Sequence, residues 1–427
     1  MLALSLISFL GACLVLPAVR AAVPDIGKGA FNPRDYTKKV ATCKAVNRAE
    51  GKEVDIQLHY VDVNPEAKQT LLLVHGWPSL WSSWKYQIQE FQDDYRLIIP
   101  DLRGFGSSTH PGDVKSSGTM FDLVGDLLCI LKDAKVAQTV CVGYVLLRSM
   151  SVACSIQTRL LQSRSHDWGC QICFEAGRSR PDVFNAIIGL TIPYLPSAGH
   201  YMPIKALIQQ LPRLSYTVFF DEKIADAVAE LSKDVQRTLR ATLRTVDSPP
   251  PDAFLTQTDS FLGGWKDVQE IPPIPFFTQE EEDYWVEQYD IQKFNYTLYF
   301  YTSENRKASY DFVSKQGNYT LLQPVLNILP ESDPVADWVL ASKLLRSADY
   351  LPYLTSEVMP GAHWHHLEHP AHANQLMRKW LDKLAAASAS AVFTTAPTSS
   401  PVSSSVAATA ATSATHATTD EHNRDEL

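Results

Sequence analysis

The sequence predicts an α/β fold, in which a mostly parallel sheet is flanked by helices and carries an inserted helical domain. Short apolar runs alternate with segments of helical periodicity in the first half of the chain and again near its end. Such alternation is typical of parallel strands, because the crossover between them is usually a helix. Between residues 196 and 323 the alternation is lost, and helical segments surround a proline-rich stretch. We expect these inserted helices to close over the carboxyl edge of the sheet, where ligand sites gather.

Each expected element has its own signal. The apolar run at 70–74 ends at a His-Gly turn, and the run at 139–142 stops at Gly143. Apolar residues at helical spacing predict a helix at 120–132, and Pro370 suits a first helical turn. The expected strands are 70–74, 96–100, 139–142, 186–190, 325–329 and 357–359, and the expected helices are 120–132, 224–243, 279–289 and 370–386.

Composition narrows the class of protein. The chain has 427 residues, enough for one large core with an inserted domain or for two domains. Its net charge is −9 and no basic patch stands out, so nucleic acid is not an expected partner. The seven cysteines do not make a disulfide scaffold. Cys43 and Cys129 can pair, whereas Cys141, Cys170 and Cys173 are expected to be small buried apolar side chains.

Both ends of the chain carry targeting signals. Residues 1–21 are expected to be a signal peptide, because an apolar run ends in Val-Arg-Ala, a small-residue site for signal peptidase. The alternative is an uncleaved signal anchor, since no Lys or Arg precedes the run. Residues 385–427 are rich in Ala, Ser and Thr, which predicts a disordered tail.

The last four residues, from Arg424 to Leu427, read Arg-Asp-Glu-Leu and resemble the retrieval signal of the endoplasmic reticulum. We therefore expect an address in the lumen of the endoplasmic reticulum, with a retrieval receptor as a partner, or secretion. Asn295 and Asn318 each begin a glycosylation sequon, which fits either compartment.

Two short motifs carry the chemistry. Residues 75–78 read His-Gly-Trp-Pro directly after an expected strand, and residues 166–169 read His-Asp-Trp-Gly. Together they resemble the oxyanion loop and the nucleophile elbow of an α/β-hydrolase whose nucleophile is a carboxylate, here Asp167. A carboxylate can open an epoxide or displace a halide by forming an ester, and it cannot follow the acyl-transfer route of lipases.

Residues 144–165 interrupt the elbow. A strand of such a hydrolase runs straight into Gly-His-Asp-Trp-Gly, but here 22 residues separate Gly143 from His166. We interpret them as a translated intron. The codons of residues 143–145 can hold a GTATGT donor and those of 164–165 a CAG acceptor, so that excision of 66 nucleotides joins a Gly codon to His166. The alternative is a genuine loop insertion, which would disturb a tight turn that must hold the nucleophile rigidly.

Apart from this insert, residues 31–384 resemble the epoxide hydrolase family of α/β-hydrolases, most densely at 75–84, at 101–107 and at the elbow. The expected organisation is a signal peptide (1–21), a hydrolase core in two parts (31–195 and 324–384) with the anomalous insert (144–165), a helical cap (196–323) and the tail (385–427).

The resemblance implies three catalytic roles. Asp167 would attack the epoxide and form an alkyl ester. His363 would take a proton from the water that cleaves the ester, and Asp333 would orient the His363 ring. Glu331 and Asp337 are rival orienters.

The resemblance also places an oxyanion hole. The backbone N–H groups of Trp77 and Trp168 would stabilise the developing negative charge. His75, Gly76 and Pro78 complete the motif, and Pro78 favours an extended backbone before it, which helps to turn a donor inward.

Two cap tyrosines of the family give a proton to the epoxide oxygen. Tyr216 and Tyr301 stand in the matching motifs of this chain. The second motif departs from the family at Tyr299, where an Asn usually stands, and at Thr302, where an Arg usually follows. The family implies a small-molecule epoxide as the substrate and neither a cofactor nor a metal. The sequence makes no prediction of the oligomeric state.

The sequence also allows alternative functions. A haloalkane dehalogenase shares the elbow but has halide donors in place of paired cap phenols. A non-catalytic lumenal protein is the alternative if the insert is real. Residues 365–369 fit His-x-x-Glu-His, a zinc-protease pattern that needs a continuous helix. Pro370 follows at once, so we expect a loop there and no metal site.

Overall fold

The computed structural model describes residues 29–144 and 168–394, with side chains up to residue 387. The expected signal peptide, the insert after Tyr144 and the tail beyond Thr394 lie outside the described residues. The chain divides into two compact units, Met1–Asp382 and Lys383–Leu427. The first unit contains the whole sheet.

An eight-stranded sheet, counted over the described residues, has the order β1-β2-β4-β3-β5-β6-β7-β8. β1 pairs antiparallel with β2, and β2 with β4, whereas every other pair is parallel. The strands are β1 (Lys38–Asn47), β2 (Lys52–Val63), β3 (Thr70–Val74), β4 (Arg96–Pro100), β5 (Thr139–Gly143), β6 (Phe184–Leu190), β7 (Val325–Pro330) and β8 (Leu354–Met359). The strands β3 to β7 are almost wholly buried, as parallel strands covered on both faces are. The predicted fold class is therefore confirmed.

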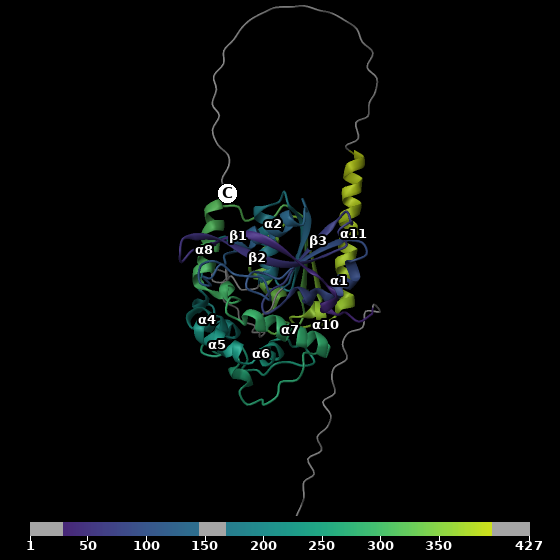
Figure 1. Cartoon of the computed structure of the whole chain (residues 1–427). Helices are drawn as coiled ribbons and strands as arrows, with labels where there is room; N and C mark the ends of the chain where they lie inside the picture. Colours follow the sequence, from purple (N-terminus) through teal and green to yellow (C-terminus); the bar gives the residue numbers. More distant parts are fainter. Residues whose placement is uncertain (1–28, 145–167, 395–427) are drawn as a thin grey trace, which may run out of the picture. The chain divides into compact units, whose positions relative to one another are not determined.

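Helices flank the sheet on both sides, with α2 on one side of β3 and α1 on the other (Figure 1). The helices are α1 (Lys85–Phe91), α2 (Met120–Asp133), α3 (Trp168–Ser179), α4 (Ser215–Glu222), α5 (Ile224–Lys233), α6 (Val235–Thr242), α7 (Gln279–Gln292), α8 (Ser303–Gln316), α9 (Trp338–Leu344), α10 (His365–Glu368) and α11 (Pro370–Thr394). The start of α2 is a capping box, in which Thr119 and Asp122 each accept a hydrogen bond from the backbone N–H of the other, at 3.3 and 2.9 Å.

The end of α11 differs from the expectation. This helix runs to Thr394, so residues 385–394 are helical where the sequence predicts disorder, because their alanines favour a helix. Over the described residues, none of the helices has both the length and the apolar character that crossing a membrane requires.

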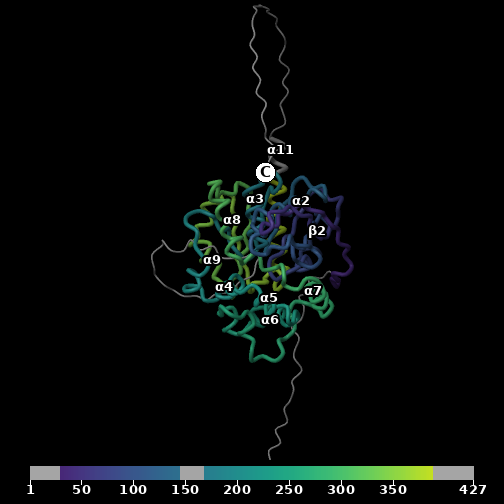
Figure 2. The backbone as a smooth tube through the Cα atoms, turned by 60° about the vertical axis from the view of Figure 1, so that its left-hand side comes forward, coloured from purple at the N-terminus to yellow at the C-terminus, as the bar shows by residue number. Residues whose placement is uncertain are grey.

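The described helices α4 to α8 lie between β6 and β7, and α4 to α7 gather at one end of the first unit (Figures 1 and 2). The expected helix at 224–243 is two helices. Asp234 interrupts it and caps α6 by accepting a hydrogen bond from the N–H of Arg237 at 2.9 Å. A buried ion pair fastens this helical insertion to the core, since Lys85 Nζ of α1 lies 2.7 Å from Glu281 Oε1 of α7.

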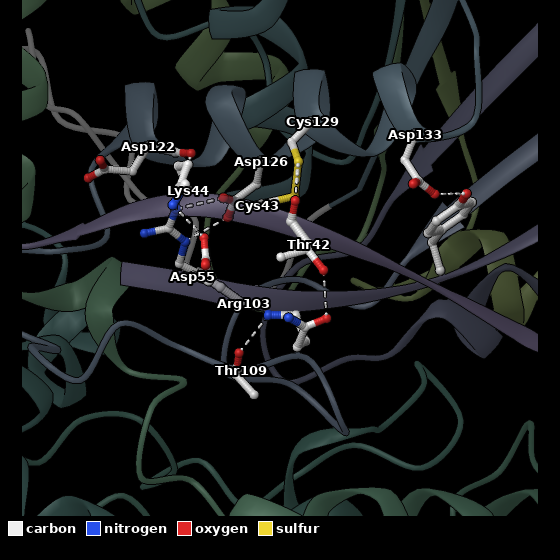
Figure 3. Close-up of a disulfide and its surroundings, with 12 residues drawn as sticks. Thr42, Cys43, Lys44, Asp55, Arg103, Thr109, Asp122, Asp126, Cys129 and Asp133 are labelled. Carbon is white, nitrogen blue, oxygen red and sulfur yellow. Dashed lines mark hydrogen bonds and ion pairs between the residues drawn. A yellow bond between two sulfur atoms is a disulfide. The ribbon is translucent and has the colours of Figure 1, made fainter. Parts of the chain in front are cut away.

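Two disulfides cross-link the described part of the first unit. Cys43 of β1 is bonded to Cys129 of α2 (Figure 3), a pairing that the sequence left open. Cys141 of β5 is bonded to Cys173 of α3. The expectation of two separate apolar side chains is wrong for this buried pair, because the strand and the helix bring the two Cα atoms to 5.4 Å. Cys170 keeps its thiol.

Candidate active site

The end of β5 and the start of α3 meet directly, although the insert separates them in the chain. A Cβ atom built on Gly143 would lie 2.2 Å from the carbonyl oxygen of Gly169. One built on Gly169 would lie 2.4 Å from the carbonyl oxygen of Val74 in β3. Both positions therefore admit only glycine, because the backbones of β3, β5 and α3 are in direct contact there. In an elbow without the insert, Gly143 and Gly169 would stand two positions before and two positions after the nucleophile, where small residues are needed. His166 and Asp167 themselves lie outside the described residues.

Tyr144, the first residue of the insert, fills the space behind the end of β5. Its side chain is fully buried, and its hydroxyl group is hydrogen-bonded to that of Ser79. Its ring centroid lies 4.1 Å from that of His366 and 4.8 Å from that of Trp84. In the sequence, Tyr144 follows Gly143 directly, as His166 would if residues 144–165 were absent.

Asp333 and His363 come together beyond the carboxyl ends of β7 and β8. Nδ1 of His363 lies 2.8 Å from Oδ2 of Asp333. The same oxygen accepts a hydrogen bond from Nε1 of Trp338 at 2.8 Å, and Oδ1 accepts one from the N–H of Val335 at 2.9 Å. These bonds fix the carboxylate, so that it can orient the imidazole.

The rival orienters lie elsewhere. Glu331 is exposed, and Asp337 caps α9 by accepting a hydrogen bond from the N–H of Leu340 at 2.8 Å. Residues 365–368 form the short helix α10, where the sequence predicts a loop. Among the described residues, no group of three or more His, Cys, Asp or Glu side chains is arranged to hold a metal ion.

Two buried cap tyrosines pack against each other and against the predicted oxyanion residues. The ring of Tyr216 on α4 lies 5.8 Å from that of Tyr301, just before α8. The Tyr301 ring also lies 5.5 Å from Trp77 and 5.8 Å from Trp168. Tyr299 instead stacks on His110, and burial raises the pKa of Tyr299 well above its ordinary value. The geometry therefore favours Tyr301 over Tyr299 as the second phenol.

His75 holds the loop that follows β3. Its Nε2 accepts a hydrogen bond from the N–H of Leu102 at 3.0 Å, and we assign the proton to Nδ1, which lies 2.8 Å from the carbonyl oxygen of Gly76. Burial lowers the pKa of His75 to about 4, so the ring is neutral at pH 7. On the other side, Nε1 of Trp77 donates to Oγ1 of Thr297 at 3.1 Å, which ties the loop to the helical insertion.

Comparisons with known proteins agree with this fold. A family model described as the alpha/beta hydrolase fold matches residues 69–144. A solved epoxide hydrolase from Vigna radiata has a TM-score of 0.65 at 20 % identity, with 83 % of this chain and 100 % of that one covered. Epoxide hydrolase A from Mycobacterium thermoresistibile has a TM-score of 0.62 at 22 % identity, with 81 % and 98 % covered.

The curated relatives are also named epoxide hydrolases. Bifunctional epoxide hydrolase 2 of Rattus norvegicus is 26 % identical over 330 residues, which are 76 % of this chain and 53 % of that protein. Epoxide hydrolase A of Mycobacterium tuberculosis is 24 % identical over 338 residues, which are 77 % of this chain and 95 % of that protein. The chain thus spans about half the length of the mammalian relatives that it matches.

Proposed function

We propose that this chain, which belongs to the α/β-hydrolase superfamily, is an epoxide hydrolase that adds water to an oxirane and releases a vicinal diol. The observation that carries the proposal is the pair of buried phenols, Tyr216 and Tyr301, beside Trp77 and Trp168. A phenol can give a proton to an epoxide oxygen as the ring opens, whereas a departing halide needs no proton. The names of the curated relatives support the same class of reaction.

In the proposed reaction the carboxylate of Asp167 attacks an oxirane carbon and the C–O bond breaks. The oxygen that departs takes a proton from Tyr216 or Tyr301, and an alkyl ester of Asp167 remains. Nε2 of His363 then takes a proton from a water molecule, which attacks the ester carbonyl carbon. The two predicted oxyanion donors stabilise the tetrahedral intermediate. On collapse of this intermediate, the departing alkoxide takes the proton held by His363, and the diol leaves. The proton of the regenerated carboxyl group returns to the tyrosinate, which restores both Asp167 and the phenol.

We further propose that the active protein lacks residues 144–165 and has 405 residues, that is 427 minus 22. The contact between Gly143 and Gly169 supports this, because both sides of the insert already lie where an uninterrupted elbow needs them. The test compares the two forms after expression in the same host. Turnover by the shorter form alone is expected, and equal turnover by both would contradict the proposal. Sequencing a transcript across this region gives an independent answer.

The reaction itself is tested by offering styrene oxide and a primary bromoalkane to the 405-residue form. We expect diol formation without bromide release, no activity for Asp167→Ala, and an Asp167 ester visible by mass spectrometry in His363→Gln. Bromide release with the epoxide untouched would assign a dehalogenase instead. No conversion of either compound by either form would favour the non-catalytic alternative.

We also propose that the chain passes through the secretory pathway. Two disulfides support this, since such bonds persist in oxidising compartments, and the sequon residues Asn295 and Asn318 are both exposed. The test removes residues 424–427 from the protein in cultured cells. A larger secreted fraction, and a loss of mass on glycosidase treatment, are the expected results. An unchanged distribution would argue against retrieval.

A further inference from the structure

The proposed ring opening needs groups from two parts of the chain. Asp167 directly precedes α3 of the core, whereas Tyr216 and Tyr301 belong to the helical insertion between β6 and β7. The nucleophile and the phenols must meet at one epoxide, and a misplacement of about 1 Å can cost roughly 100-fold in rate. A contact that holds the insertion against the start of α3 therefore bears on the reaction.

Phe300 stacks on Trp168, with the two ring centroids 4.7 Å apart and the ring planes inclined by 15°. Phe300 directly precedes Tyr301 in the chain. Trp168 directly follows Asp167. Phe300 is 1 % exposed and Trp168 is 6 % exposed, so the stack is shielded from water. Aromatic pairs at such distances attract each other beyond the burial of their area. The stack therefore joins the residue before a proposed proton donor to the residue after the nucleophile.

Thr297 makes a second contact between the same segment and the core. Its Oγ1 accepts a hydrogen bond from Nε1 of Trp77 at 3.1 Å, and both residues are buried. The chain then forms a single 3-10 turn, η6 (Tyr299–Tyr301), in which the N–H of Tyr301 donates to the carbonyl oxygen of Leu298 at 3.0 Å. Because the backbone between Thr297 and Tyr301 is this compact, the hydrogen bond to Trp77 also restricts where Tyr301 can lie.

We infer that Phe300 and Thr297 are positioning residues, which hold the phenol of Tyr301 in place against the nucleophile during ring opening. The inference rests on the proposed function. Neither side chain exchanges a proton with the substrate in the proposed reaction. Ester hydrolysis relies on His363 and Asp333, which both belong to the core, so it does not need the insertion to be aligned in the same way. Substitution of either positioning residue should therefore slow ring opening and spare ester hydrolysis.

The first test asks whether the stack couples the insertion to the core, and it uses the full 427-residue chain, so that it does not depend on turnover. Denaturant titrations compare Phe300→Leu, Trp168→Leu and the double variant. The double variant should lose less free energy of unfolding than the sum of the two single losses, because both substitutions remove the same contact. The matched control is Phe312→Leu, which removes a ring contact with the same centroid distance of 4.7 Å, to Phe121 of α2. Its loss should add to that of Trp168→Leu.

The second test separates the two steps in the catalytically active form. In the His363→Gln background the ester of Asp167 accumulates, so mass spectrometry can follow its formation from styrene oxide and its slow decay once the excess epoxide is removed. Adding Phe300→Leu should slow ester formation roughly 10- to 100-fold and leave ester decay unchanged. Phe300→Tyr keeps a stacking ring, and its hydroxyl group can enter the cavity that Phe300 lines, so it should restore most of the rate. Phe312→Leu should change neither rate.

Thr297 is tested in the same background. Thr297→Val keeps the branched shape of the side chain and removes the acceptor for the indole N–H of Trp77, so ester formation should slow by roughly tenfold. Thr297→Ser keeps the hydroxyl group and should form the ester as fast as the background variant does. Because Thr297→Val also destroys the glycosylation sequon of Asn295, the matched control is Asn295→Gln. It removes the sequon, leaves the hydroxyl group in place and should not slow ester formation.

Two results would overturn the inference and leave the proposed function standing. One is an additive loss of the free energy of unfolding in Phe300→Leu and Trp168→Leu. The other is ester formation in Phe300→Leu that matches the background variant, or that slows together with ester decay, as a general loosening of the fold would cause. If Phe300→Leu does not fold, the same two rates in Thr297→Val decide. Absence of an Asp167 ester in His363→Gln alone would overturn the proposed function, and with it the role of the two side chains.

Discussion

Replacing Asp333 by Asn tests the link between the carboxylate and the imidazole of His363. Oδ2 of Asp333 accepts hydrogen bonds from His363 and from Trp338, both at 2.8 Å, and Oδ1 accepts one from the N–H of Val335 at 2.9 Å. An asparagine has one acceptor oxygen and one NH₂ donor. If the oxygen keeps the bond to Val335, the NH₂ group faces two N–H donors. The imidazole then takes the tautomer with its proton on Nε2, which cannot accept a proton from water.

We expect turnover to fall about 10⁴-fold, the size of the loss when the acid of a Ser-His-Asp triad becomes an amide. The indole N–H of Trp338, left without an acceptor, should lower the free energy of unfolding by about 1–3 kcal/mol. Ester hydrolysis needs the base and ester formation does not. The variant should therefore give a burst of one equivalent of bound substrate and then stall.

The assay follows diol release over time together with the mass of the intact protein. The matched control is Asp337→Asn, which removes the same charge from the cap of α9. Asparagine caps a helix about as well as aspartate, so this variant should keep the turnover and stability of the wild type. The reasoning is refuted if Asp333→Asn turns over within tenfold of the wild type or accumulates no ester.

Three further predictions concern stability. Replacing Cys43 and Cys129 by Ala should lower the free energy of unfolding by about 2–5 kcal/mol, because their bond closes a loop with a sequence separation of 86 residues. In denaturant titrations, reductant should therefore lower the unfolding midpoint of the wild type more than that of the variant, which keeps only the Cys141–Cys173 bond. Lys85→Met should cost about 3–5 kcal/mol, because it leaves Glu281 buried without its cation, and adding Glu281→Gln should recover most of that loss in thermal melts. Acid should destabilise the fold through His75, since burial lowers its pKa from 6.5 to about 4 and the unfolded chain therefore binds more protons between these values. The free energy of unfolding should fall by about 3 kcal/mol from this residue as the pH drops through that window, and a flat profile would contradict the buried neutral ring.

The central strands could be predicted because they are continuous apolar runs. The bounds of β3 and β4 agree with the expected 70–74 and 96–100. The strands β1 and β2 were missed, because both are only half buried; β1 is the edge strand and β2 lies between it and β4. The buried positions of β1 include the small side chains of Ala41, Cys43 and Ala45, so the alternation of apolar and polar residues is weak there.

At the site, the motifs that resemble the epoxide hydrolase family were enough to predict that Asp333 and His363 meet. They were not enough for Trp338, because a single tryptophan on a helix usually packs against its neighbours and gives no sign that it donates to a carboxylate. The burial of Arg306 was missed for a related reason. An arginine in a polar helical segment is expected to be solvated, and only the packing of α8 against the loop before α2 shows that it is buried.

The bond between Cys141 and Cys173 has a consequence for the integrity of the chain. Its sequence separation is 32 residues, and the insert at 144–165 lies wholly inside this ring. A single proteolytic cut within the ring would leave both fragments covalently joined, so a gel would show the cleavage only after reduction. In the 427-residue form, this disulfide would keep the fragment with β1 to β5 joined to the fragment with α3 and β6 to β8 after a cut in the insert.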